Sequence, residues 1–129
     1  MFSIFVNMQI ITLIAVVLQN DIMRDIWYKI LGLIQQKDVL ISEHGYDELV
    51  ADDIAVPDVM AGTGDAYVIE EYPEFPKGSC VLVLQYDKGG SAIHAVWGIP
   101  KGLSSPAVLV TAYRPDPAKW TDDFKRRKP

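Results

Sequence analysis

Residues 107–120, Ala-Val-Leu-Val-Thr-Ala-Tyr-Arg-Pro-Asp-Pro-Ala-Lys-Trp, decide the fold of this chain. The Val-Leu-Val run at 108–110 is apolar and largely β-branched, which is typical of a strand inside a sheet. Two prolines flank Asp116 and end that strand. Asp116 can act as an N-cap, and Pro117 suits the first position of a helix, where a missing N–H costs nothing. The stretch therefore predicts a buried strand followed by a short helix.

The expected C-terminal helix carries Trp120 and Phe124 four residues apart on one face. We expect both rings to belong to the core, since this spacing would dock the helix on the domain. Tyr113 and Arg114 then stand at the end of the strand, just before the turn.

Upstream of this stretch the apolar pattern is extended from residue 66 onward. Turn clusters rich in glycine and proline separate its segments and are short enough for hairpins. We expect an antiparallel meander of four strands, at residues 66–72, 80–86, 92–99 and 107–113. In the third strand His94 alternates with Ile93 and Ala95, so its side chain should point to the opposite face of the sheet.

Before residue 66 the pattern is helical. Apolar residues at three- and four-residue steps predict a helix over 21–36, and Ser42 can cap a second helix over 43–51, after a short extended segment at 39–41. A third, shorter helix is expected within residues 54–61. The fold class is α+β, with N-terminal helices packed on a four-stranded antiparallel meander and a short C-terminal helix.

Residues 1–20 contain no charged side chain and form an apolar leader. Its length would allow a membrane span, although Asn7 and Gln9 near its middle are costly in hydrocarbon. A segment packed on the domain, or one appended outside the fold, is the alternative. Residues 21–129 are expected to form a single domain, either cytoplasmic or anchored to a membrane through the leader.

Charge is unevenly distributed along the chain. Residues 1–100 carry a net charge of −9, and residues 101–129 carry +4. The basic island at 125–128 could serve an acidic partner or a nucleic acid, and it could equally complement the dipole of a C-terminal helix.

The sequence offers few motifs for chemistry. It contains no glycine-rich dinucleotide fingerprint, no phosphate-binding loop and no nucleophile elbow, so we expect no nucleotide cofactor. Cys80 is the single cysteine, which excludes a disulfide within the chain and favours a buried thiol. His44 and His94 are far apart in sequence without ligand spacing, and no metal site is suggested.

Five polar residues are candidates for a site. His44 and His94 are the side chains that titrate near neutrality without perturbation, so they could exchange protons, although a capping and a half-buried histidine are the plain alternatives. Lys101 and Arg114 could bind a phosphate, and Arg114 could instead pair with a carboxylate. Tyr113 could orient a substrate or simply pack its ring.

Residues 21–127 resemble a family of small bacterial proteins classed as domain of unknown function 4258. The residues that carry the resemblance are Ile-Ser-Glu-His-Gly-Tyr-Asp-Glu-Leu at 41–49, Val-Ile-Glu-Glu-Tyr-Pro at 68–73, Cys-Val-Leu-Val-Leu at 80–84, Ile-His-Ala-Val-Trp-Gly-Ile at 93–99 and Thr-Ala-Tyr-Arg-Pro-Asp at 111–116.

The resemblance implies a compact α+β domain similar to RelE-like and BrnT-like ribonuclease toxins of toxin–antitoxin systems. His44, His94 and Tyr113 match family positions. The family commonly carries an arginine near positions 49–53, where this chain has Leu-Val-Ala-Asp-Asp. Loss of that cation and the acidic body both weaken an RNA-binding surface.

Two functions are therefore expected. In the first, the domain is a metal-independent ribonuclease in which His44 and His94 act as base and acid, Arg114 and Lys101 stabilise phosphate charge, and Tyr113 orients the RNA. In the second, it is a non-catalytic binding or regulatory module. The corresponding partners are RNA, an antitoxin-like protein, or a membrane reached through residues 1–20.

Overall fold

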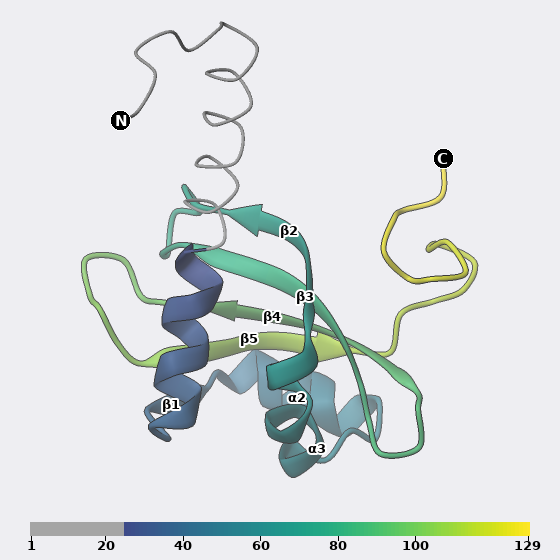
Figure 1. The fold of residues 1–129 in the computed structure, drawn as a ribbon, viewed down its shortest axis with the longest axis horizontal. Coiled ribbons are helices and arrows are strands. Elements are labelled where there is room, and N and C mark those ends of the chain that lie inside the picture. The colour runs from purple at the N-terminus through teal and green to yellow at the C-terminus, as the bar shows by residue number, and fades with distance from the viewer. Residues whose placement is uncertain (1–24) are drawn as a thin grey trace, which may run out of the picture.

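The computed structural model describes residues 25–129, so the apolar leader and the expected start of the first helix lie outside the described residues. Along the chain come a helix over residues 25–35, β1 (Val39–Ile41), α2 (Glu43–Ala51), α3 (Val56–Ala61), the short 3₁₀ helix η1 (Thr63–Asp65), β2 (Tyr67–Tyr72), β3 (Cys80–Tyr86), β4 (Ala92–Gly98) and β5 (Ala107–Tyr113), as Figure 1 shows. The α+β class is confirmed. No helix within residues 25–129 is both long and apolar enough to cross a membrane.

In the described part of the chain, the sheet has five strands in the order β1-β5-β4-β3-β2. The predicted meander of β2 to β5 is confirmed, because each of these strands pairs antiparallel with the next along the chain. The prediction of a purely antiparallel, four-stranded sheet is wrong, because the extended segment β1 adds a fifth strand parallel to β5. A three-residue strand carries no local sign of a partner so distant in sequence.

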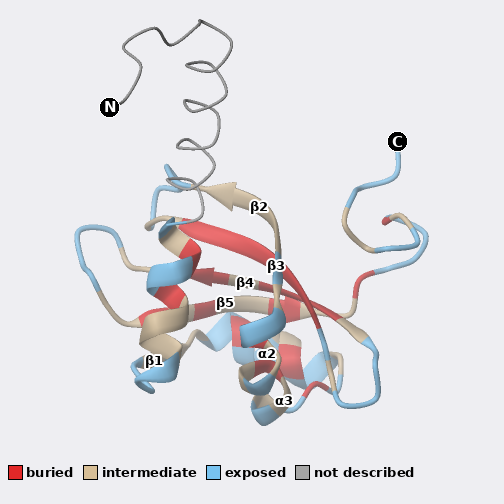
Figure 2. Ribbon diagram, viewed as in Figure 1, coloured by how far each residue is buried: buried red, intermediate tan, exposed pale blue. Residues whose placement is uncertain are grey.

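The helices cover one face of the sheet. Trp27 and Ile30 of the first helix and Leu49 of α2 are buried against β3, β4 and β5, where Trp97 is the largest fully buried side chain. Figure 2 shows this core as the buried band along β3 and β4. Buried Gln85 of β3 donates a 2.7 Å hydrogen bond to the carbonyl of Val59 and so ties α3 to the sheet.

Ser42 fixes the start of α2 on β5. Its hydroxyl oxygen accepts from the backbone N–H of Gly45 at 2.9 Å and donates to the carbonyl of Val110 at 2.9 Å. The predicted N-cap is confirmed. Gly45 permits this close approach, since a Cβ there would lie 2.7 Å from the carbonyl oxygen of Leu109.

The expected C-terminal helix is absent, and this prediction is wrong. The carbonyl of Asp116 accepts from the N–H groups of Lys119 and Trp120, which makes a single turn. Thr121 and Asp123 then bond to each other and to nearby backbone, which competes with a helix. Phe124 has a φ of +59°, so the chain turns back and Trp120 forms an isolated bridge with Arg127.

Residues 115–129 are called the C-terminal strap. Figure 1 draws the strap as a yellow coil on the far side of the sheet from α2 and α3. Trp120 is 6% exposed, as its predicted core role requires, whereas Phe124 is half-buried and not a core residue.

The strap lies on the face of the sheet opposite the helices, called the outer face. The register of the strands places on it Tyr67, Glu70 and Tyr72 of β2, Leu82 and Leu84 of β3, His94 of β4, and Tyr113 of β5. The predicted orientation of His94, away from Ile93 and Ala95, is therefore confirmed.

Candidate functional site

His94 lies at the centre of the outer face and is fully buried. Its Nδ1 is 3.3 Å from the hydroxyl oxygen of Tyr113, the residue opposite it on β5. Its Nε2 is 2.8 Å from the backbone carbonyl oxygen of Phe124 in the strap. The indole of Trp120 packs edge-on against the imidazole, with ring centroids 4.4 Å apart. Both ring nitrogens are thus occupied.

These contacts define the tautomer of His94. A carbonyl oxygen can only accept, so Nε2 carries the proton and donates it to Phe124. Nδ1 is then free to accept from the Tyr113 hydroxyl. Burial lowers the pKa of His94; the Phe124 carbonyl opposes this shift, Arg127 adds to it and Glu70 opposes it. His94 is consequently neutral and carries no ring nitrogen open to a substrate.

Glu70 and Tyr72 add polar groups to the outer face on β2, whereas Tyr113 lies on β5, on the other side of His94. Tyr72 donates to the carboxylate of Glu70, which also pairs with Arg127 of the strap. Burial raises the pKa of Tyr113, and burial followed by the bond to Glu70 raises that of Tyr72. Both hydroxyls therefore stay protonated and act as donors.

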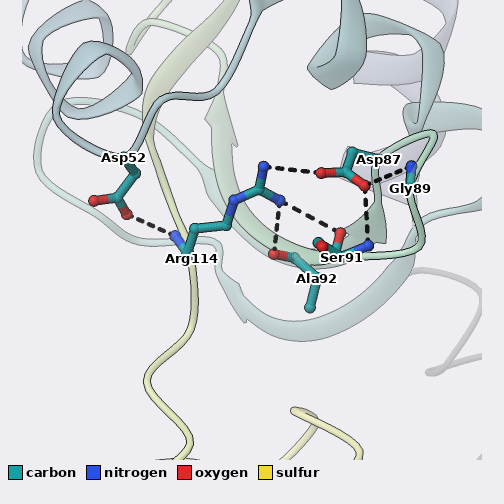
Figure 3. Close-up of polar contacts among 6 residues, drawn as sticks. All are labelled: Asp52, Asp87, Gly89, Ser91, Ala92 and Arg114. Carbon is teal, nitrogen blue, oxygen red and sulfur yellow. Dashed lines mark hydrogen bonds and ion pairs between the residues drawn. The ribbon is translucent and has the colours of Figure 1, made fainter.

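Arg114 follows Tyr113, and its side chain points toward Asp87 and the β3–β4 turn (Figure 3). The guanidinium lies 2.8 Å from the Asp87 carboxylate and donates to the carbonyls of Ser91 and Ala92 at 3.4 and 3.3 Å. Its backbone N–H donates to Asp52 at 2.7 Å. Arg114 thus joins the end of α2, the end of β5 and the β3–β4 turn, as in the carboxylate-pairing alternative.

Asp87 organises that turn. Its carboxylate accepts from the N–H groups of Gly89 and Ser91, each at 2.9 Å, as well as from Arg114 (Figure 3). The Ser91 N–H, the Arg114 guanidinium and the Gly89 N–H together lower the pKa of Asp87. The carboxylate remains charged over the physiological range.

His44 and Lys101 lie elsewhere. His44 is on the first turn of α2, on the helix side of the sheet, where its side chain is 68% exposed and its Nε2 is 3.9 Å from Glu48. Lys101 is exposed in the loop after β4, beside a hollow of about 530 Å³ that Lys29 and Glu74 also line. Arg114 follows the neighbouring antiparallel strand, so the two cations stand at opposite ends of the sheet.

The structure therefore brings together His94 and Tyr113 and leaves the other three candidates apart. His44 and His94 are separated by the sheet. Neither histidine lines the hollow beside Lys101. Within residues 25–129 no three His, Cys, Asp or Glu side chains gather closely enough to hold a metal ion.

A feature that the motif search missed is a hollow beside β2, called the β2 groove. It has a volume of about 710 Å³ and lies between the first helix and the edge strand. Its walls include Trp27, Tyr28 and Leu31 of the helix and Tyr67, Ile69 and Glu70 of β2. Two glutamates and no basic residue are among the described residues that line it.

Two cations of the strap contact this groove's β2 wall. Lys125 Nζ lies 4.2 Å from the ring centroid of Tyr67, and Arg127 pairs with Glu70. Arg127 also lies over the ring of Trp120, 4.9 Å from its centroid. In the sequence, the basic island at 125–128 indicated that this segment could contact acidic groups. The residue spacing could not show that its contacts lie on β2.

Comparison with known proteins gives one match. The family model described as Domain of unknown function (DUF4258) matches residues 41–114, which is more than half of the chain, and the chain belongs to this family. The match ends at Arg114, immediately before the strap. Neither the search of curated proteins nor the search of solved structures returned a match.

Proposed function

We propose that this member of the DUF4258 family is a non-catalytic binding module that takes an extended, basic segment of a partner protein along the β2 groove. The observation that carries the proposal is the contact of Lys125 and Arg127 with Tyr67 and Glu70. A basic segment of this chain already contacts two side chains that line the groove, Tyr67 and Glu70, from the outer face of the sheet.

The position of β2 suits strand addition. Within residues 25–129, β2 is the last strand of the sheet and pairs with β3 along one edge. The backbone groups on the other edge of such a strand are a template for an extended peptide, whose main chain supplies affinity while its side chains fill neighbouring pockets. Six residues of β2 offer a length of about 20 Å at roughly 3.3 Å per residue.

The lining of the groove fits a basic and partly apolar peptide. Trp27, Tyr28 and Leu31 offer apolar surface from the helix, and Tyr28 is 60% exposed. The carboxylate of Glu70 on β2 favours cations and repels an acidic peptide or a nucleic acid backbone. An antitoxin-like protein with an extended basic segment would meet this description.

The ribonuclease hypothesis receives less support from the geometry. It requires His44 and His94 to share a cleft, whereas one is exposed on α2 and the other is buried beneath the strap with both nitrogens bonded. The phosphate-binding roles of Arg114 and Lys101 also require them to converge. The hypothesis, with its likeness to RelE-like and BrnT-like toxins, stays a prediction.

The test is peptide binding by the purified full chain, measured by fluorescence anisotropy. The probes are a labelled peptide of alternating valine and lysine and a matched peptide of alternating valine and glutamate. We expect the lysine peptide alone to bind. Tyr28→Ala should weaken binding about tenfold, as expected for an aromatic contact residue of an interface. Tyr46→Ala is the matched control, because Tyr46 is 56% exposed on α2 and does not line the groove.

Equal binding of both peptides, or of the parent and Tyr28→Ala, would reject the β2 groove as the site. Loss of binding in Tyr28→Ala but not in Tyr46→Ala would support it.

A further inference from the structure

We propose that the C-terminal strap is a built-in competitor that occupies the β2 wall of the groove and must leave before a partner's basic segment can bind. This inference rests on the proposed function, since it describes the regulation of the same site. It assigns to residues 115–129 an autoinhibitory role that the family match, ending at residue 114, does not cover.

The backbone hydrogen bonding of the strap suits its release from the sheet as one unit. Thr121 donates to the Arg126 carbonyl and Lys128 to the Lys119 carbonyl, each at 2.8 Å. Among the described residues, every backbone–backbone hydrogen bond that the strap makes has both ends within it. Release of the strap would therefore break no backbone–backbone hydrogen bond to the sheet.

Side chains hold the strap to the outer face. The contacts are the bond from His94 to the Phe124 carbonyl, the packing of Trp120 on His94, the pair between Arg127 and Glu70, and Lys125 over Tyr67. Figure 2 shows most of the strap as exposed or intermediate. The ionic contacts are partly exposed, with the Arg127 side chain 58% and the Glu70 side chain 29% accessible, and exposed ion pairs are weak.

The face beneath the strap combines the buried apolar side chains Leu82 and Leu84 with several polar groups. Glu70, Tyr72, His94 and Tyr113 lie there, and burying such groups is costly unless each finds a partner. Polar contacts that can be exchanged for those of another chain suit a cover that opens.

The strap also indicates the spacing of the partner's side chains. Lys125 and Arg127 are two positions apart and meet Tyr67 and Glu70. In an extended segment, residues two apart point to the same side. The strap is bent at residues 124–126, so its two cations reach β2 without an extended backbone. An extended partner segment with cations at alternate positions would bring both to the same side and displace Lys125 and Arg127 from the ring and the carboxylate.

A tethered competitor reduces the apparent affinity for a partner, because the intrinsic association constant is multiplied by the fraction of molecules in which the site is free. Arg127→Ala removes both the ion pair with Glu70 and the contact with the Trp120 ring. Contacts of these two kinds together correspond to a factor of roughly 5 to 30. We therefore expect Arg127→Ala in the full chain to bind the valine–lysine peptide about fivefold to thirtyfold more tightly than the parent does.

Arg126→Ala is the matched control. It removes the same charge from the adjacent position, where the side chain is exposed and the backbone alone contributes hydrogen bonds. We expect its affinity for the peptide to stay within about twofold of the parent's. An equal gain in peptide affinity in both variants would show that the effect comes from net charge, and it would overturn the proposal that the strap is a competitor.

Hydrogen exchange gives a second readout that does not depend on a variant. Addition of the valine–lysine peptide to the parent should speed exchange at residues 119–128, because the released strap loses its cover from the sheet. Binding without faster exchange there, together with unchanged affinity in Arg127→Ala, would overturn the competitor and leave the proposed function standing. No binding by the parent or by Arg127→Ala would reject both.

Discussion

His94 Nε2 donates a 2.8 Å hydrogen bond to the backbone carbonyl of Phe124, and this bond joins the middle of the sheet to the last turn of the chain. The bond requires a neutral imidazole with its proton on Nε2, because the Tyr113 hydroxyl occupies Nδ1. The protonation state of one buried side chain is thereby coupled to the position of the strap.

This coupling predicts that stability declines in mild acid. Burial lowers the pKa of His94 below its ordinary value of 6.5, so the unfolded chain binds more protons than the folded one once the pH falls below that value. The free energy of unfolding therefore keeps its full value above pH 6.5. It decreases as the pH falls toward the pKa that His94 has in the folded protein. Urea midpoints measured from pH 7.5 down to 5 test this.

His94→Gln is the control for the pH profile. Its amide can still donate to the Phe124 carbonyl but does not titrate, so its midpoints should vary less over this range. Asp87 and Asp123 have lowered carboxyl pKa values, so they affect the pH dependence of the free energy of unfolding only below about pH 3.8. That is outside the range of pH 7.5 to 5. Identical profiles for the parent and the variant would show that His94 is not the titrating group.

Arg114 is predicted to stabilise the fold. Arg114→Ala should lower the free energy of unfolding by about 1–3 kcal/mol, because it leaves the Asp87 carboxylate and two turn carbonyls without their charged donor. Arg126→Ala, which removes an exposed arginine, should change it by less than about 0.5 kcal/mol. Equal stabilities of the two variants in urea would instead leave Arg114 available for a ligand.

The ribonuclease hypothesis predicts cleavage of single-stranded RNA that depends on His44. The structure leads us to expect none from the folded full chain in the presence of a chelator, since the sheet lies between His44 and His94. A gel that compares the parent with His44→Ala decides the matter. Cleavage that falls at least about a hundredfold in His44→Ala would restore the hypothesis, because that is the scale of a lost general acid or base.

Two glycines should respond oppositely to alanine. Gly45→Ala would place a Cβ 2.7 Å from the Leu109 carbonyl oxygen, so α2 must move away from β5, at a cost of about 1–3 kcal/mol. Gly32 lies within the first helix, and a Cβ added there would meet no neighbouring atom within 4 Å. Gly32→Ala should therefore stabilise the protein by roughly 0.5–1 kcal/mol, the difference in helix propensity. Thermal unfolding of both variants checks the pair.

The elements that periodicity and caps specify were predictable. The helix expected over 21–36, the Ser42 cap and the strands from β2 to β5 each depend on residues close in sequence. The structure has the helix over 25–35 within the described residues, and it has the cap and the strands. The pairing of β1 with β5 depends on residues far apart, and no local pattern encodes it.

The site was less predictable because its contacts are tertiary. Sequence reasoning identified His94 and Tyr113 and placed both at the sheet, but the carbonyl of Phe124 that closes the cluster is a backbone group and has no residue-type signal. The predicted C-terminal helix does not form because the N-cap at Asp116 starts a single turn. After that turn, Thr121 and Asp123 form hydrogen bonds with each other and with nearby backbone. These local hydrogen bonds give the strap its turns in place of a helix.

The parallel pairing of β1 with β5 also governs the order in which the nascent protein can fold. Ser42, which follows β1, bonds to Val110, 68 positions further along the chain. During synthesis, α2 and β1 therefore leave the ribosome long before their partner strand exists. Completion of the sheet must wait until β5 has been synthesised, and until then the side of α2 that packs on β5 lacks its partner strand.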